Sequence, residues 1–216
     1  MIITKHFYMI RHGQTEANAA EIMAGSMDSP LTKRGRDQAY AVQKVMEGLS
    51  VKPKVIAHSH LSRARDTASI INEVLGVPMR EDADLAELHA GEWEGVPWAD
   101  CPDLITGWPD PPGGERFEEF MIRVSRGKNR HLEAHEGPVL IVCHGGVFRA
   151  FGKLYNLEVG GIIENCHLYE FEPDPDGGSF PWRAWHYDLN GPHAVRNVAK
   201  PFHGTLEERL GNIASK

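Results

Sequence analysis

The alternation of short apolar runs with segments of helical periodicity constrains the fold of this chain more than any other feature. The expected strands are residues 5–10, 53–57 and 138–143, and the expected helices are residues 32–49, 62–75, 115–136 and 145–155. Strands that alternate with helices of this length are typical of parallel sheets whose two faces are covered by the helices. The sequence therefore predicts an α/β fold, a three-layer α/β/α sandwich with a mainly parallel sheet.

The C-terminal part of the chain departs from this alternation. Residues 166–171 and 183–189 are separated by a Pro-Asp-Pro-Asp-Gly-Gly sequence, which predicts a hairpin with an extended loop at the edge of the sheet. Residues 96–114 are rich in Pro, Trp and Gly and lack a clear period, so we expect a lid loop there. Residues 200–216 are expected to form a loose tail of a single domain that spans residues 1–216.

Composition and charge exclude several classes of partner. A net charge of −7 and a pI near 5.9 disfavour a broad surface for nucleic acid or acidic membranes. The chain has three cysteines, Cys101, Cys143 and Cys166, and none of them form a Cys-x-x-Cys pair. An odd number of cysteines does not make a disulfide framework, which favours a reducing, cytoplasmic location. We find no signal peptide and no apolar stretch long enough for a membrane span. We therefore expect a small-molecule partner, no nucleic acid and no membrane, and leave a homodimer open.

Four segments place reactive side chains where the chain turns from a strand towards a helix. They are Arg-His-Gly-Gln at 11–14, Ser-His-Leu-Ser-Arg at 59–63, Asp-Leu-Ala-Glu at 84–87 and Cys-His-Gly-Gly at 143–146. The carboxyl ends of parallel strands meet at one edge of a sheet, where open α/β folds bind their ligands. The sequence therefore predicts that two imidazoles, at least two guanidinium groups and one carboxylate lie close together.

This set of side chains suits the transfer of a phosphoryl group without a metal or a cofactor. An imidazole can attack phosphorus, guanidinium groups bind phosphate oxygens, and a carboxyl group can protonate the leaving oxygen. The glycines at 145–146 would offer backbone N–H groups to an anion at a helix start. His58 and His60 form a pattern that is seen among metal ligands, but the nearby Arg63 would repel a cation. We therefore predict no metal site.

Together and in this order, the four segments resemble the histidine phosphatase superfamily, which also contains the cofactor-dependent phosphoglycerate mutases, over residues 5–160. The resemblance implies a phosphoglycerate mutase-like fold and a phosphomonoesterase that forms a phosphohistidine intermediate on a small substrate. It makes His12 the phosphoryl acceptor and Glu87 the proton donor. The other site residues that it implies bind the phosphate, and they are Arg11, Gln14, Asn18, Arg63, His144, Gly145 and Gly146.

Three alternatives remain beside this interpretation. A mutase-type phosphotransferase would carry a long insertion and an Arg-His-Tyr-Gly signature after the Trp-Glu-Gly segment, whereas Val-Pro-Trp follows Gly95 here. Cys143 and Arg149 have the Cys-x5-Arg spacing of cysteine-dependent phosphatases, an assignment that leaves His12 and Glu87 without a role. A non-catalytic module that binds phosphorylated ligands would lack the acceptor or the donor, and both are present.

Overall fold

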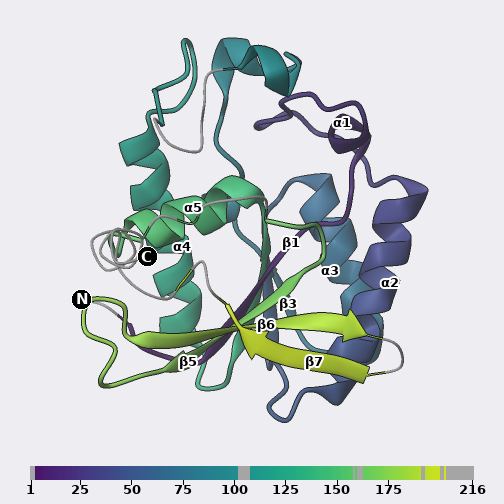
Figure 1. The fold of residues 1–216 in the computed structure, drawn as a ribbon, viewed down its shortest axis with the longest axis vertical. Helices are drawn as coiled ribbons and strands as arrows, with labels where there is room; N and C mark the ends of the chain where they lie inside the picture. The colour runs from purple at the N-terminus through teal and green to yellow at the C-terminus, as the bar shows by residue number, and fades with distance from the viewer. Residues whose placement is uncertain are drawn as a thin grey trace, which may run out of the picture.

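A seven-stranded sheet forms the middle layer of the computed structural model, which describes residues 3–101, 108–157, 159, 163–190, 193–199 and 202 (Figure 1). The strands are β1 (Phe7–Arg11), β2 (Val55–His58), β3 (Met79–Glu81), β4 (Val139–Cys143), β5 (Leu168–Pro173), β6 (Trp182–Asn190) and β7 (His193–Val198). Their order across the sheet is β3-β2-β4-β1-β5-β6-β7. Strands β1 to β4 run parallel, whereas β5, β6 and β7 extend the sheet by antiparallel pairing.

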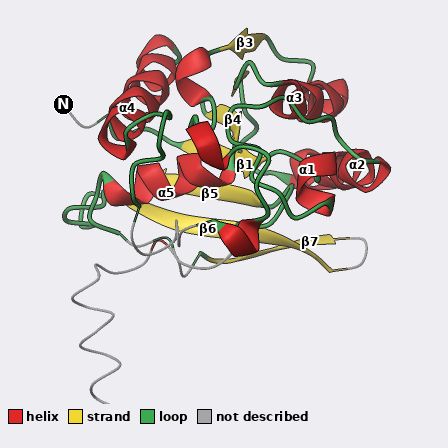
Figure 2. Ribbon diagram, turned by 90° about the horizontal axis from the view of Figure 1, so that it is seen from above, coloured by secondary structure: helices red, strands yellow, loops and turns green. Residues whose placement is uncertain are grey.

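Helices cover both faces of this sheet, as Figure 2 shows. The α-helices are α1 (Glu16–Ala19), α2 (Lys33–Gly48), α3 (Ser62–Leu75), α4 (Phe117–Ala134) and α5 (Gly145–Lys153), and three short 3₁₀ helices are η1 (Ala83–Leu85), η2 (Gly91–Trp93) and η3 (Trp98–Asp100). Helices α2 and α3 pack on one face, and α4 and α5 pack on the other. The predicted three-layer α/β/α fold is confirmed. Within the described residues, no helix has both the length and the apolar character needed to cross a membrane.

Residue alternation along the central strand divides the core into two halves. Successive side chains of a strand point to opposite faces of the sheet. Phe7 and Met9 of β1 accordingly join the core formed with α4 and α5, whereas Tyr8 and Ile10 join the core formed with α2 and α3. All four side chains are almost completely buried. The strand is therefore held in place from both sides, which fixes the position of the residues that follow it.

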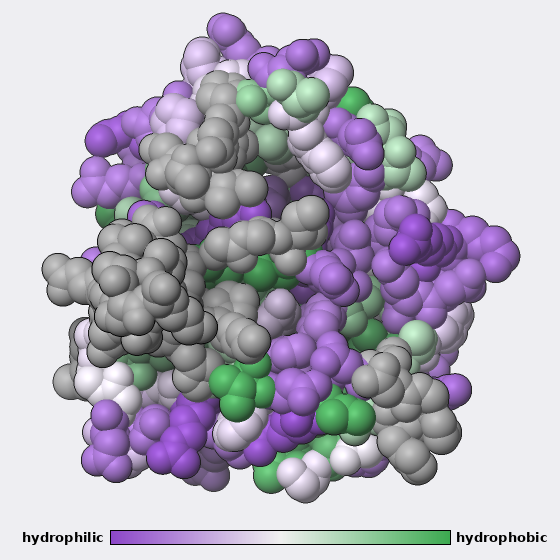
Figure 3. Space-filling view, in the orientation of Figure 1, coloured by the Kyte–Doolittle hydropathy of each residue, from purple (hydrophilic) through white to green (hydrophobic). Residues whose placement is uncertain are grey.

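The start and end of the predicted helices agree with their local chemistry. Thr32 caps α2, because its Oγ1 atom accepts a hydrogen bond from the Gly35 backbone N–H at 3.0 Å. Helix α3 ends at Gly76, which adopts a left-handed φ of +62° that an L-residue adopts only with strain. The outer side of α2, at the right of Figure 3, is strongly hydrophilic, while Val42 and Met46 face the sheet. These helices are amphipathic, as the sequence predicted.

The C-terminal hairpin forms as predicted, but its expected position at the edge of the sheet is wrong. Strand β5 pairs with β1 inside the sheet, and β7 occupies the edge beyond β6. The pairing of β5 with β1 buries a ring stack between Phe7 and Phe171, whose centroids lie 4.7 Å apart. The sequence did not predict β3 or β7, because a strand as short as β3 and one as polar as β7 have little apolar pattern.

The expected lid and tail are described only in part. Of the predicted lid, residues 96–101 and 108–114 are described, and residues 102–107 lie outside the described part of the chain. Trp108 stacks on Phe117 at the start of α4, with 4.0 Å between the ring centroids. Of the predicted tail 200–216, the structure describes Phe202, which is buried in the core that α4 and α5 form with the sheet.

Candidate active site

The ends of β1, β2 and β4 bring the predicted segments together at one edge of the sheet. The backbone N–H of His12 donates to the Cys143 carbonyl at 3.0 Å, and the N–H of Ser59 donates to the Val142 carbonyl at 3.1 Å. These bonds continue the parallel pairing one residue beyond the strands. The first, second and fourth reactive segments therefore begin side by side, as the sequence predicted from the parallel sheet.

His12 is buried, with 4% of its surface exposed. Its Nδ1 atom lies 2.7 Å from the Gly13 carbonyl oxygen. Because a carbonyl can only accept, Nδ1 of the neutral ring carries the proton and Nε2 keeps its lone pair. Burial lowers the pKa of His12 well below its usual value, and the charges of Arg11 and Arg63 lower it further. The ring is therefore neutral near neutral pH, with a basic nitrogen available.

His144 is the residue immediately before α5 and is completely buried. Its ring centroid lies 5.1 Å from that of His12. The Nε atom of Arg63 donates to His144 Nδ1 at 3.2 Å, and since a guanidinium group can only donate, the proton of the neutral ring sits on Nε2. Among the described residues, this buried Nε2 atom has no hydrogen-bond partner. Burial lowers the pKa of His144 well below its usual value, with Arg63 adding to the effect.

Arg63 lies in the first turn of α3 and is 2% exposed. Besides His144, it donates from Nη1 to the Met27 carbonyl and from Nη2 to the Gly25 carbonyl, both at 2.7 Å. Burial lowers its pKa, while the negative charge of Glu87 acts in the opposite direction. One guanidinium group thus joins the start of α3 to a loop that follows α1 and sets the proton position of the second imidazole.

Arg11, the last residue of β1, contributes a second cation, which is half-buried. Its Nη1 atom donates to the Ile163 carbonyl at 2.6 Å, and its buried Nε atom has no hydrogen-bond partner among the described residues. Burial lowers the pKa of Arg11, and Glu87 counteracts this. Two guanidinium groups and one carboxylate therefore share a small, poorly solvated region next to the two imidazoles.

Glu87 lies two residues after η1 and is fixed by backbone donors. Its Oε2 atom accepts from the Gly146 N–H at 2.9 Å, and its Oε1 atom accepts from the Leu88 N–H at 3.0 Å. A Cβ atom at position 146 would lie 2.2 Å from Glu87 Oε1, so only glycine allows this approach. The Gly146 N–H therefore binds Glu87 in this structure, and of the predicted glycine pair Gly145 lies instead against Arg11.

Gln14 and Asn18 both have structural contacts. The Thr32 hydroxyl donates to Gln14 Oε1 at 2.9 Å, which places the amide at the start of α2. Asn18 Oδ1 accepts from the Thr15 N–H at 3.2 Å in the capping box of α1, and from Asn165 Nδ2 at 3.3 Å. The Asn165 amide also donates to the His12 carbonyl at 2.8 Å, which links Asn18 to the reactive segment.

The sequence did not indicate that Arg123 of α4 supports the Glu87 segment. Its guanidinium donates to the Ala86 carbonyl at 2.7 Å and to the Glu87 carbonyl at 2.8 Å. It also forms two hydrogen bonds of 2.6 and 2.7 Å with the Glu115 carboxylate. The only signal in the sequence is that Glu115 follows the Pro-Pro-Gly-Gly segment, and the carbonyl partners of Arg123 carry no sequence signal at all.

Two alternative sites find no support in this geometry. His58 is buried and contacts the Ser59 carbonyl at 3.0 Å, whereas His60 is exposed, so the two rings do not share an environment. Cys143 is completely buried, and burial raises the pKa of its thiol well above the usual value. A cysteine-dependent phosphatase needs the opposite shift, because the thiolate is its nucleophile.

Comparisons with known proteins agree with this geometry. The family model of the histidine phosphatase superfamily (branch 1) matches residues 7–185. A glucosyl-3-phosphoglycerate phosphatase of Mycolicibacterium vanbaalenii is 33% identical over 212 residues, covering 86% of this chain and 93% of that protein. A metal-independent phosphoserine phosphatase of Arabidopsis thaliana is 32% identical over 177 residues, covering 71% and 74%. A solved mycobacterial glucosyl-3-phosphoglycerate phosphatase in complex with VO3 has a TM-score of 0.71 at 31% identity, covering 87% of this chain and 99% of that chain. The chain therefore belongs to the histidine phosphatase superfamily, branch 1.

Proposed function

We propose that this phosphomonoesterase hydrolyses its substrate in two displacements, with His12 as the phosphoryl acceptor and Glu87 as the proton donor. The observation that carries the proposal is the position of the proton on each of the two buried imidazoles, which differs between them. His12 Nε2 has a lone pair, and His144 Nε2 has a proton without a partner among the described residues. One ring is thus prepared to attack phosphorus and the other to donate to a phosphate oxygen.

In the first displacement, His12 Nε2 forms a bond to phosphorus as the bond to the leaving oxygen breaks. The electron pair stays on that oxygen, which takes a proton from the Glu87 carboxyl group. Arg11, Arg63 and the His144 Nε2–H stabilise the charge on the remaining phosphoryl oxygens. The neutral form of His12, favoured by its lowered pKa, is the form that can attack.

In the second displacement, water attacks the phosphohistidine and gives its proton to the Glu87 carboxylate. The bond between phosphorus and nitrogen breaks, the lone pair returns to His12, and phosphate leaves. The enzyme is thereby restored without a metal or a diffusible cofactor. Gln14 and Asn18 lie on the segment after His12 and are proposed to border the phosphate pocket together with the backbone of Gly145, while the Gly146 N–H holds Glu87.

We propose a small organic phosphate monoester as the substrate. Two relatives are named for glucosyl-3-phosphoglycerate and phosphoserine, which are both of this class. The three free cysteines, Cys101, Cys143 and Cys166, support a reducing, cytoplasmic setting. A panel of phosphorylated sugars, glycerates and amino acids, assayed by phosphate release, would identify the preferred substrate.

A trapped phosphoenzyme tests the mechanism. We expect His12→Ala to reduce turnover by roughly 10³-fold or more, because the acceptor is lost. His60→Ala is the matched control, since that histidine is exposed in the neighbouring segment, and it should keep full activity. Phosphoenzyme from rapidly quenched wild type should be acid-labile and alkali-stable, as a phosphoramidate is, and it should be absent from His12→Ala. Loss of the phosphoenzyme in Cys143→Ser, with its retention in His12→Ala, would assign the chemistry to the cysteine instead.

A further inference from the structure

A second group of potential ligands lies on the C-terminal hairpin, outside the proposed phosphate pocket. His186 of β6 is opposite Tyr169 of β5, and Asp188 follows two residues later on the same face of the sheet. His167 directly precedes β5 and lies beside both of them. All three side chains are partly exposed, with 16%, 23% and 37% of His167, His186 and Asp188 accessible, so an ion from solution can reach them.

Three atoms of this group form a small triangle. His167 Nε2 lies 2.8 Å from His186 Nδ1 and 3.6 Å from Asp188 Oδ1, and His186 Nδ1 lies 3.4 Å from Asp188 Oδ1. Bonds of about 2.0–2.1 Å from zinc to nitrogen or oxygen, at tetrahedral angles, separate the ligand atoms by about 3.3–3.4 Å. The three observed distances, from 2.8 to 3.6 Å, lie on both sides of this value. An ion at bonding distance from all three atoms would sit just outside their plane and keep one coordination position open.

Neighbouring side chains orient the same three ligands. Asn197 Nδ2 of β7 donates to Asp188 Oδ2 at 2.7 Å, which leaves Oδ1 directed at the histidines. On the other side of His167, the Glu164 carboxylate lies 3.6 Å from Nδ1. Metal-binding histidines commonly face a carboxylate with the ring nitrogen that does not bind the metal. Both the ligand atoms and their supports are therefore arranged as in a metal site.

We propose that His167, His186 and Asp188 bind a divalent transition-metal ion of the zinc class, at a place where the sequence predicted no metal site. Two imidazoles and one carboxylate are ligands that zinc prefers, and magnesium or calcium would demand more oxygen atoms. The ion stabilises the fold and takes no part in phosphoryl transfer. It would fix the segment that contains Asn165 and Cys166, which bond to the His12 and Arg11 carbonyls at 2.8 and 2.9 Å.

Metal binding can be measured on the whole chain after removal of bound ions with a chelator. Calorimetric titration with zinc should give one ion per chain, and saturating zinc should raise the Tm by about 5 °C or more. Cobalt in place of zinc should give the strong visible absorption of a tetrahedral site. The chelated protein should keep its turnover, because the proposed chemistry uses no metal.

Variants locate the ion. His186→Ala and the milder Asp188→Asn should each weaken zinc binding by roughly 100-fold or more and abolish the cobalt spectrum. His60→Ala is the matched control and should bind as wild type does. His12→Ala should also bind normally, which separates this site from the phosphate pocket. Circular dichroism and the Tm without metal report whether each variant folds. The proposal is overturned if wild type binds no zinc at 0.1 mM (about ten times a weak Kd of 10⁻⁵ M), if both hairpin variants still bind it, or if His12→Ala loses it.

Discussion

Glu87 shows how a single side chain acquires its proposed catalytic position from its surroundings. Its sequence context contains several other carboxylates, among them Asp84, Glu92 and Glu94. Asp84 pairs with arginines of α4, and Glu94 accepts hydrogen bonds from Ser26, whereas Glu87 reaches the start of α5 beside the buried histidines. What distinguishes Glu87 from the other carboxylates is its contacts with distant segments of the chain. These contacts cannot be predicted from the spacing of the residues in the sequence.

The proposed proton-donor role of Glu87 predicts a dependence on the leaving group. An alkoxide needs a proton as it departs, whereas a nitrophenolate needs it far less. We expect Glu87→Gln to slow the hydrolysis of a sugar phosphate by ~10²–10⁴-fold and that of nitrophenyl phosphate much less. His12→Ala should affect both substrates alike. Glu92→Gln is the control and should leave both rates nearly unchanged. Equal, mild losses in Glu87→Gln, with leaving-group dependence in Glu92→Gln, would show that the donor is misassigned.

Two helices, α4 and α5, hold Glu87 in place. Helix α5 contributes the N–H of its second residue, Gly146, to the Glu87 side chain. Helix α4 contributes Arg123, which binds the Glu87 carbonyl from the other side. The backbone and the side chain of the same residue are thus fixed by different elements. A substitution that removes either contact should therefore slow the proposed proton transfer from Glu87.

Gly146→Ala tests the contact with α5. Its Cβ atom would come within 2.2 Å of Glu87 Oε1, so the carboxylate must move. We expect a fall in kcat for sugar phosphates of roughly 10²-fold, with a smaller effect on nitrophenyl phosphate. Gly145→Ala is the matched control, because its Cβ atom would meet Arg11 Nε at an ordinary contact distance of 3.7 Å. Steady-state kinetics on both substrates measure the difference, and equal losses in the two variants would contradict the explanation.

Arg123→Met tests the contact with α4. The substitution keeps the aliphatic length of the side chain and removes every donor to Glu115, Ala86 and Glu87. We expect kcat to fall more than KM changes, with the same leaving-group dependence as in Glu87→Gln, because Arg123 acts by positioning Glu87. Arg123→Lys should restore part of the activity. Arg116→Ala, which breaks an exposed pair with Glu118, is the control. A variant that merely loses folded protein would instead slow both substrates equally.

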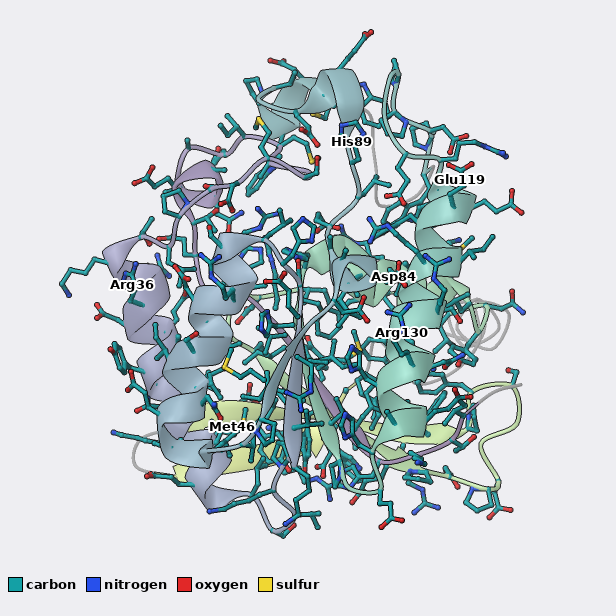
Figure 4. All side chains as sticks on the ribbon, turned by 180° about the vertical axis from the view of Figure 1, so that it is seen from behind. Arg36, Met46, Asp84, His89, Glu119 and Arg130 are labelled. Carbon is teal, nitrogen blue, oxygen red and sulfur yellow. The ribbon has the colours of Figure 1, made fainter. Side chains whose placement is uncertain are left out.

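At the scale of the whole molecule, Asp82 and Asp84, which follow the edge strand β3, connect the sheet to helix α4 by ion pairs. Asp84 of η1 pairs with Arg126 and Arg130 of α4 at 2.6 and 2.7 Å, and Figure 4 shows Asp84 and Arg130 between η1 and α4. Hydrogen bonds from Arg126 and then Arg130 lower the pKa of Asp84 from 3.8 to about 2. The pairing therefore stabilises the position of the segment that continues to Glu87.

The lowered pKa of Asp84 predicts how stability depends on pH. Because the folded-state pKa lies below the unfolded value, this contribution is complete above about pH 4 and disappears as the pH falls towards 2. Asp84→Asn should lower the free energy of unfolding at pH 6 by about 1–2 kcal/mol, a figure reduced because both arginines are half exposed. The difference from wild type should shrink between pH 4 and pH 2.5 in urea titrations. Asp37→Asn, in an exposed pair with Lys33, should change stability little at any pH. A difference that does not depend on pH would contradict the assignment.

Local sequence determined much of this protein. Short apolar runs specified β1, β2 and β4. The cap residue Thr32 specified where α2 begins, and Gly76 specified where α3 ends. Arg11, His12 and His144 lie at the carboxyl ends of strands that pair in parallel, so their meeting at one edge was predictable from the fold class alone. These features depend on hydrogen bonds and apolar contacts that recur in every chain with the same local pattern.

Tertiary structure alone decided the rest. The antiparallel pairing of β5 with β1, the edge position of β7 and the support of Glu87 by Arg123 and Gly146 all join residues far apart in the chain. Backbone carbonyls and N–H groups take part in most of these contacts, and every residue type except proline offers both. Proton positions on His12 and His144 likewise follow from a carbonyl and a guanidinium placed by folding. The sequence therefore determined which reactive groups meet, and the packed structure determined their orientation and charge.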